Sequence, residues 1–355
     1  MLDADTQRLD GEILKFIRRY AGGPAPEASF EALAFKIFRY QFERNANYRK
    51  FCRMERKRPG ELGSWRDIPA MPAVGFKELI LAAFPLKNAV KKFRTSGTTQ
   101  TARGVHLFDT LKLYEASMVP AFQSYLMPGQ GSFSFYFLVA TPAEAADSSL
   151  SHMLGVVNER FAKGCGKYYV KKGILLSEAL AGDLKKSNGQ AMILGTAFSL
   201  KAFLDFLQKK KLSLRLASGS RLMETGGFKG RTREISKPAL VAQCRRWLGI
   251  ERKFCVSEYG MTELSSQFYD SALRNRFRGP AWARVLIVDS RTGRPAPLGV
   301  AGLVCVVDLA NRGSVLAVQT EDWGRRRGDA FELLGRARGS ELRGCSLSYE
   351  EFLNV

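Results

Sequence analysis

Histidine is scarce in this sequence, and its cysteines are widely spaced. Two histidines, His106 and His152, occur in 355 residues, and none of the six cysteines forms a C-x-x-C pair. A zinc site with the usual ligand spacing is therefore not expected. Five cysteines are predicted to be free thiols that fill the core as small apolar side chains: Cys52, Cys165, Cys244, Cys255 and Cys305.

Long apolar runs are also missing. No stretch reaches the roughly 18 residues that a membrane-spanning helix needs. The first residues, MLDADTQRLDGEILKF, lack the charged and then apolar pattern of a signal peptide. We therefore expect a cytoplasmic protein. Apolar residues make up 45% of the chain and charged residues 25%, which is typical of a globular protein with a substantial core.

Acidic residues are outnumbered by basic ones. The sequence has 55 Lys and Arg against 34 Asp and Glu, a formal net charge of +21. Nucleic-acid binding is one explanation of such a charge. However, the basic residues are dispersed in short groups, and no zinc-finger, helix-turn-helix or RNA-recognition signature accompanies them. A positive field also favours a phosphate-rich small substrate such as ATP, or an acidic partner protein.

The hydrophobic pattern changes along the chain. Apolar residues at near-helical spacing predict helices over residues 1–60. Further on, strand-like runs such as GSFSFYFLVATP and QAMILGT alternate with helical segments such as SLSHMLGVVNERF and SLKAFLDFLQKKK, with Ser199 as a possible cap of the last. Near the C-terminus, ARVLIVDSRTGRPAPLGVAGLVCVVDL predicts two antiparallel strands. We therefore expect an α/β fold in three parts: a helical segment (1–90), an α/β core (91–280) and a small β unit (281–355).

The first candidate site is the segment TSGTT, which follows the strand-like VKKFR. Its glycine and hydroxyl residues can present backbone N–H and side-chain O–H donors to phosphate oxygens. A plain turn is the alternative, and the Gly-Lys-Ser/Thr ending of a Walker loop is absent. The candidate phosphate ligands are Thr95, Ser96, Gly97, Thr98, Thr99 and Arg103.

The second candidate site is EYGMTE, directly after the probable strand KFCV. Ligands of open α/β sheets bind at such strand ends. Tyr259 could stack on a base, Thr262 could hydrogen-bond a phosphate, and Glu263 could hold a magnesium ion. Gly260 and Met261 lie between them. The alternative is an ordinary helix start.

The third candidate site is TEDWG, followed shortly by LGR. The Asp322 carboxylate could accept hydrogen bonds from both hydroxyls of a ribose. Arg336 could pair with a phosphate or with that carboxylate. A surface turn is the alternative.

Together, these segments resemble the motifs of the adenylate-forming superfamily of acyl and aryl ligases. TSGTTQTAR is similar to that family's phosphate loop, EYGMTE to its nucleotide and magnesium motif, TEDWG to its ribose motif, and GRARGSELRG to its hinge motif. Gln100 and Arg103 depart from the glycine and lysine that are usual in the loop. The resemblance implies the large domain of such a ligase, with mixed and parallel sheets flanked by helices, and it implies ATP and Mg²⁺ as cofactors.

A narrower resemblance, to the LuxE-type acyl-protein synthetases, covers essentially the whole chain. It is carried by NYRKFC, ADSSLSHM, METGGFKGR and RGCSLSYEEF. It implies that a carboxylic acid, expected to be a fatty acid, is activated as an acyl-adenylate and passed to Cys345 as a thioester. An acyl-accepting partner such as a reductase or a carrier protein is implied as well.

The resemblance also suggests further site residues. The chain stops ten residues after Cys345, so the C-terminal lid domain of ordinary ligases and its lysine are expected to be absent. Arg103, Mg²⁺ or Lys229 would then neutralise charge on the phosphates. His152, which the resemblance places in a helix, could accept the Cys345 proton.

The remaining expectations concern the acyl chain and the second histidine. Gly226 and Gly227 would let the backbone approach an acyl chain closely, with Phe228 in an apolar pocket. A structural role is the alternative for His152 and the interpretation for His106.

Other functions stay open on the sequence. The adenylate could be passed to coenzyme A or to a carrier protein, in which case Cys345 would be dispensable. The chain could also be a non-catalytic nucleotide-binding interaction subunit, and a nucleic-acid-binding protein is the least favoured alternative. The identity of the acid, the final acceptor and the oligomeric state are not determined by these motifs.

Overall fold

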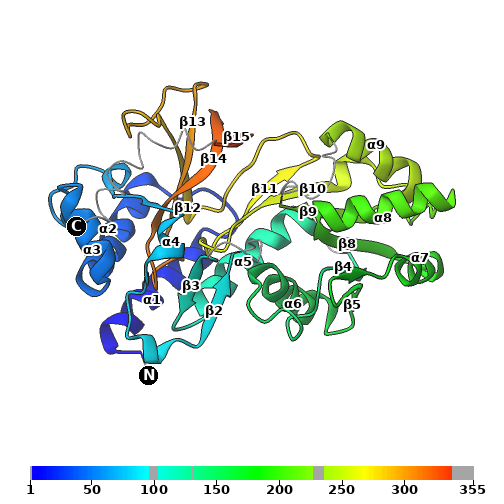
Figure 1. The fold of residues 1–355 in the computed structure, drawn as a ribbon, viewed down its shortest axis with the longest axis horizontal. Coiled ribbons are helices and arrows are strands. Elements are labelled where there is room, and N and C mark those ends of the chain that lie inside the picture. The colour runs from blue at the N-terminus through cyan, green and yellow to red at the C-terminus, as the bar shows by residue number, and fades with distance from the viewer. Residues whose placement is uncertain (1, 96–102, 130, 227–235, 338–355) are drawn as a thin grey trace. The chain divides into compact units, whose positions relative to one another are not determined.

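The computed structural model of the chain describes residues 2–95, 103–129, 131–226 and 236–337 (Figure 1). Two units account for the fold. Unit 1 comprises Met1–Ala121, Met261–Gln267 and Arg278–Val355, and unit 2 comprises Phe122–Gly260 and Phe268–Phe277. Both units are therefore discontinuous in sequence. The division of the chain near residues 90 and 280 stays a prediction.

Helices open unit 1, as the apolar periodicity of residues 1–60 predicts. They are α1 (Ala4–Arg19), α2 (Glu27–Arg44) and α3 (Ala46–Met54), and the short α4 (Gly75–Glu78) follows. The Asp3 carboxylate caps α1 by accepting from Thr6 N at 2.9 Å, and Asn45 caps α3 by accepting from Tyr48 N at 3.0 Å. Longer α5 (Lys112–Leu126) begins in unit 1 and ends in unit 2.

The main sheet of unit 1 has five strands in the order β1-β14-β13-β12, with β15 paired to β14. Their bounds are β1 (Met71–Pro72), β12 (Ala283–Val288), β13 (Ala301–Asp308), β14 (Ala317–Arg327) and β15 (Ala330–Arg336). β12 and β13 form the predicted antiparallel pair, and β14 and β15 continue the antiparallel pattern. In contrast, β1 runs parallel to β14. A strand from the N-terminal part of the chain thus completes the C-terminal sheet.

A separate hairpin in unit 1 carries the predicted phosphate loop. It consists of β2 (Lys91–Arg94) and β3 (Val105–Phe108), paired antiparallel with Phe93 opposite His106. Phe93, Phe108 and Tyr114 form a small buried cluster that anchors the hairpin on the start of α5.

The sheet of unit 2 has six strands in the order β11-β10-β9-β8-β4-β5. They are β4 (Phe133–Leu138), β5 (Lys167–Tyr168), β8 (Gln190–Thr196), β9 (Arg221–Thr225), β10 (Cys255–Tyr259) and β11 (Phe268–Ser271). All neighbours are parallel except β10 and β11. Small strands β6 (Val170–Lys171) and β7 (Ile174–Leu175) form a hairpin of their own. The expected alternation of strands and helices is confirmed.

Helices cover both faces of this sheet (Figure 1). They are α6 (Ser149–Ala162), α7 (Ser177–Lys186), α8 (Ala197–Lys210) and α9 (Lys237–Leu248). The last three share one apolar cluster with the strands, which includes Ile193, Phe203 and Leu248, while α6 lies on the opposite face (Figure 1). Because both faces are covered, the central strands β4 (FSFYFL) and β8 (QAMILGT) are mostly apolar.

Two local expectations were wrong. Thr196, and not Ser199, is the N-cap of α8: the Thr196 hydroxyl accepts from Ser199 N at 3.0 Å, and the Ser199 hydroxyl accepts from Thr196 N at 3.1 Å. Cys165 is exposed in the turn after α6, whereas Cys52, Cys244, Cys255 and Cys305 are buried as expected. Among the described residues, no helix has the length and apolar character needed to cross a membrane.

Candidate nucleotide site

The β2–β3 hairpin closes the base of the predicted phosphate loop. Thr95 N donates to Gly104 O at 2.9 Å, Gly104 N donates to the Thr95 hydroxyl at 2.9 Å, and Arg103 Nε donates to Thr95 O at 2.6 Å. The two ends of the loop are therefore fixed side by side. The other loop residues of the prediction, Ser96, Gly97, Thr98 and Thr99, lie outside the described residues.

Residues 261–267 of the second motif pack against this hairpin. The Thr262 hydroxyl donates to Arg94 O at 3.5 Å, and His106 Nδ1 lies 2.8 Å from Thr262 O. Burial lowers the pKa of His106 to about 4, so the imidazole is neutral, and its Nδ1 must carry the proton because a carbonyl only accepts. His106 thus has a structural role, which is to hold the backbone at Thr262 beside the hairpin.

The Glu263 side chain is the buried acid of the site. Residue Glu263 is only 5% exposed, and its backbone carbonyl accepts from Asn311 Nδ2 at 2.9 Å. Burial raises the pKa of the Glu263 carboxyl to about 7; the nearby Glu321 charge adds to this rise, while Lys77 and Arg336 oppose it. The carboxylate therefore lies among charges of both signs and has little contact with solvent.

The third motif brings two more carboxylates, Glu321 and Asp322, to the same unit. Asp322 on β14 is directly opposite Arg336 on β15. Arg336 Nε lies 3.6 Å from Asp322 Oδ1, and another guanidinium nitrogen lies 3.4 Å from Glu321 Oε2. Asp322 N donates to the Thr320 hydroxyl at 3.1 Å. Of the two partners that the sequence suggested for Arg336, a phosphate or the Asp322 carboxylate, the structure thus shows the carboxylate.

Buried polar side chains support the Glu263 segment from behind. Ser265 N and the Ser266 hydroxyl donate to the two oxygens of Asp308 at 2.9 and 2.7 Å, and Ser265 Oγ lies 3.1 Å from Asn311 Oδ1. Burial raises the pKa of Asp308. These contacts position the loop that contains Glu263.

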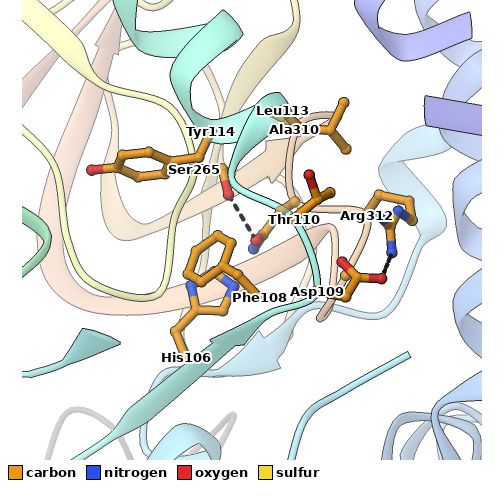
Figure 2. Close-up of a pocket in the computed structure, with 11 residues that line it drawn as sticks. His106, Phe108, Asp109, Thr110, Leu113, Tyr114, Ser265, Ala310 and Arg312 are labelled. Carbon is orange, nitrogen blue, oxygen red and sulfur yellow. Dashed lines mark hydrogen bonds and ion pairs between the residues drawn. The ribbon is translucent and has the colours of Figure 1, made fainter. Parts of the chain in front are cut away.

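A small pocket lies beside these supporting residues (Figure 2). Its lining includes His106, Asp109, Ser265 and Arg312, and Asp109 points directly at Arg312 (Figure 2). The volume is about 10 Å³, enough for about one water molecule. This pocket therefore belongs to the scaffold and is far too small for a nucleotide.

Unit 2 carries the first half of the second motif. Tyr259 ends β10, and its ring centroid lies 6.2 Å from that of Phe268 and 5.9 Å from that of Phe277. Glu258, next to it, is buried and accepts a hydrogen bond from the Thr225 hydroxyl, and burial raises the pKa of Glu258 to about 7.

The predicted acyl and catalytic residues are only partly described. Gly226 follows β9 with φ +71°, a left-handed conformation that favours glycine, and an added Cβ would meet open space. His152 is half-buried on α6, and its backbone N donates to Ser148 O at 3.0 Å. Their roles stay predictions. The other predicted residues, Gly227, Phe228, Lys229 and Cys345, lie outside the described residues.

The residues present fit a magnesium ion that is shared with a phosphate. Within the described part of the chain, no group of three or more His, Cys, Asp or Glu could hold a metal ion. Mg²⁺ is usually held by one or two carboxylates together with substrate phosphates and waters. Glu263, with Glu321 nearby, meets that requirement. The Mg²⁺ role of Glu263 stays a prediction.

Several residues of this site were not predicted from the sequence. Glu321 is part of TEDWG, so its place in that motif could have identified it as a site residue. Asn311 and Asp308 belong to no motif, and their importance follows only from the backbone atoms that they contact.

Comparison with known proteins decides the family. A family model described as "Acyl-protein synthetase, LuxE" matches residues 26–354. The chain belongs to this family. It is therefore an adenylate-forming enzyme that uses ATP to activate an acyl group. No curated protein matches the chain.

Solved structures show the same fold at low sequence identity. A 2-hydroxyisobutyryl-CoA ligase in the postadenylation state has a TM-score of 0.66 at 12% identity, covering 90% of this chain and 69% of that chain. The long-chain-fatty-acid–CoA ligase FadD1 from Archaeoglobus fulgidus has a TM-score of 0.51 at 13% identity, covering 72% and 53%. ATP-bound MatB from Rhodopseudomonas palustris has a TM-score of 0.52 at 12% identity, covering 72% and 49%. The chain thus has the α/β fold of adenylate-forming ligases and spans about half the length of the last two.

Proposed function

We propose that the enzyme adenylates a carboxylic acid, such as a fatty acid, and then transfers the acyl group to its own Cys345. The observation that supports the first step is the grouping, within unit 1, of residues from all three motifs. Thr262 is hydrogen-bonded to the hairpin that carries the phosphate loop, and Glu263 interacts electrostatically with Arg336, the partner of Asp322. Phosphate, metal and ribose ligands would therefore serve one nucleotide.

In the first step, a carboxylate oxygen of the acid attacks the α-phosphorus of ATP, and the bond to pyrophosphate breaks. Donors of the loop and Arg103 would bind the phosphates. The Asp322 carboxylate would accept from the ribose hydroxyls, with Arg336 holding it in place. Glu263 would hold Mg²⁺, which neutralises phosphate charge when bound.

In the second step, the Cys345 thiolate attacks the acyl carbon of the mixed anhydride and AMP leaves. Support comes from the sequence RGCSL, which lies inside the segment matched by the family model. Neighbouring cations such as Arg343 would lower the pKa of the thiol, and His152 would accept its proton. Lys229 would assist the phosphates. A cytoplasmic location and an acyl-accepting partner protein are part of the same proposal.

Intact mass measurement tests both steps together. The enzyme would be incubated with ATP, Mg²⁺ and a panel of carboxylic acids, and peptides would be mapped after labelling. We expect a gain of one acyl group on Cys345, which hydroxylamine removes. Cys345→Ser should abolish this gain while acid-dependent exchange of pyrophosphate into ATP survives. Cys165→Ser is the matched control, because Cys165 is an exposed thiol that any non-specific acylation would also reach.

The other outcomes identify the alternatives. Labelling that persists in Cys345→Ser but disappears in Cys165→Ser would refute the assignment of the thioester. Unchanged formation of an acyl-coenzyme A or acyl-carrier product by Cys345→Ser would favour direct transfer from the adenylate. Absence of pyrophosphate exchange with every acid would favour a non-catalytic nucleotide-binding subunit.

A further inference from the structure

Short helix α4 carries a lysine, Lys77, that none of the motifs contains. The position of α4 is set by β1, which pairs in parallel with β14 so that Pro72 is opposite Gln319. Ala73 N then donates to Gln319 O at 2.9 Å. Since Thr320, Glu321 and Asp322 follow Gln319 directly, the chain enters α4 beside the strand that carries the ribose motif.

The same helix packs against the base of the phosphate loop. The ring of buried Phe76 lies 5.6 Å from the ring of His106 in an edge-on arrangement. A Cβ added at Gly104 would lie 3.5 Å from Phe76 Cβ and 3.0 Å from Thr95 Cγ2. Phe76 therefore packs close to Gly104, one end of the loop, which is hydrogen-bonded to Thr95 at the other end. The next residue along the chain is Lys77.

The Lys77 ammonium is accessible to solvent. Its side chain is exposed, and it forms no ion pair with any residue that the structure describes. Its positive charge nevertheless acts on the buried Glu263 carboxyl, as do the charges of Glu321 and Arg336. Lys77 thus lies within electrostatic range of the proposed metal ligand and next to the proposed phosphate loop.

We propose that Lys77 binds the β- and γ-phosphates of ATP and neutralises the pyrophosphate as it leaves. The proposal rests on the adenylation function argued above. As the acid oxygen forms its bond to the α-phosphorus, the bond from that phosphorus to the bridging oxygen breaks, and the electron pair stays on pyrophosphate. An ammonium that keeps its proton balances this new charge. It suits phosphate as a compact point charge, and β1–β14 pairing holds its helix in place before the reaction.

Measuring the binding of ATP and of AMP distinguishes phosphate binding by Lys77 from a purely structural role. Lys77→Ala should weaken ATP binding about 10- to 100-fold and leave AMP binding unchanged, because AMP has no β- or γ-phosphate. In acid-dependent pyrophosphate exchange, the KM values for ATP and pyrophosphate should rise and kcat should fall, while the KM for the acid stays constant. Lys77→Arg should recover part of the loss. Lys15→Ala, at an exposed position of α1, should behave as wild type.

Each result decides the matter. Unchanged ATP affinity and kinetics in Lys77→Ala would overturn the proposal, and so would equal losses of ATP and AMP binding. A thermal melt of the variant confirms that the fold is kept. If the unmodified enzyme showed no exchange with any acid, the proposed function would fail, whereas the comparison of ATP with AMP binding would still test Lys77.

Discussion

Unit 1 and unit 2 differ in the kind of contact that holds their segments together. Unit 1 is built from three segments far apart in the sequence, whereas most of unit 2 is one continuous stretch. In unit 1, buried polar and charged side chains join the segments; Gln41 on α2, for example, donates to Asn311 O and accepts from Leu316 N, both at 2.9 Å. In unit 2, strands and helices that are neighbours in sequence bury a continuous apolar core.

A buried ionic network around Arg312 joins three segments of unit 1. The Arg312 side chain is only 1% exposed; it donates to both oxygens of Asp10 at 2.7 and 2.9 Å and to Asp109 at 2.7 Å. These contacts connect α1, the end of β3 and the loop after β13. A buried charge network of this kind has few alternative partners, so it specifies one arrangement of segments that apolar contacts alone would leave less defined.

Unit 2 has its own buried ionic cluster, but at the edge of its core. Glu224 on β9 accepts from Lys237 and from the Ser257 hydroxyl, and Lys237 Nζ also donates to Ser257 Oγ at 2.9 Å. This cluster connects the start of α9 to the two adjacent strands β9 and β10. In both units, buried polar and ionic contacts hold segments that the apolar core does not fix. The candidate site residues lie in such segments.

The largest effect is expected from breaking the Arg312 network. Arg312→Met should lower the free energy of unfolding of unit 1 by about 3–5 kcal/mol, because Asp10 and Asp109 would be left buried without a cation. Urea unfolding followed by tryptophan fluorescence measures this, since Trp65, Trp282 and Trp323 belong to unit 1.

Two controls make the Arg312 test specific. Adding Asp109→Asn to Arg312→Met should recover part of the loss by removing one buried charge. Arg8→Ala breaks an exposed pair with Asp5 and should cost less than about 1 kcal/mol. An Arg312→Met variant as stable as the unmodified enzyme would contradict the comparison of the two units.

In unit 2, the matching test is a cavity in the apolar core. Leu204 on α8 is fully buried, so Leu204→Ala should cost about 2–5 kcal/mol through lost burial and the cavity left behind. Gln208→Ala, at an exposed position of the same helix, should change stability by less than about 0.5 kcal/mol. Trp247 is the fluorescence probe within unit 2. Equal effects of the two substitutions would show that α8 does not stabilise unit 2 through its apolar face.

Each unit also has one buried glutamate whose pKa burial raises to about 7, Glu258 in unit 2 and Glu263 in unit 1. The folded state favours the neutral carboxyl, so the stabilisation is complete below about pH 4.5 and is lost as the pH rises through about 7. Replacing either residue by glutamine should reduce the loss of stability between pH 5 and 8, by on the order of 1–3 kcal/mol. Urea titrations across this pH range measure the effect. A pH dependence identical to that of the unmodified enzyme would refute it for the residue concerned.

The smallest effects compare one helix cap from each unit. Asp3→Ala removes the cap of α1, and Thr196→Ala removes the cap of α8. Each should cost about 0.5–2 kcal/mol of unfolding free energy. Thermal unfolding of the two variants is the measurement. If Thr196→Ala did not lower the free energy of unfolding, Thr196 would not be the residue that caps and stabilises α8.

Local patterns explain why much of the fold could be predicted. The segment QAMILGT coincides with β8 because a short apolar run is a strand when helices cover both faces. The helices of the first 60 residues follow from apolar spacing, and EYGMTE begins at the end of strand β10 as expected, whereas TEDWG lies inside strand β14. Predictions failed where a choice depended on a few atoms. Both Thr196 and Ser199 can cap a helix, and the backbone at Thr196, which is extended, decides which one does.

Long-range contacts explain what could not be predicted. Cys165 is exposed although its residue type is usually buried, because it lies in a turn after α6. The partners of Arg312 are 203 and 302 residues away in the sequence, and no spacing rule connects them. The same is true of Lys77, whose place beside the site depends on the pairing of β1 with β14.

The sequence by itself determined the kinds of element, the order of the motifs and the resemblance that the family match later confirmed, since these depend on residues close together in the chain. Only the tertiary structure decided which segments meet. The discontinuous unit 1, the tie between His106 and Thr262, and the approach of Lys77 to Glu263 all come from pairing and burial between distant segments. Such contacts arise from the free energy of the whole fold, which no local pattern contains.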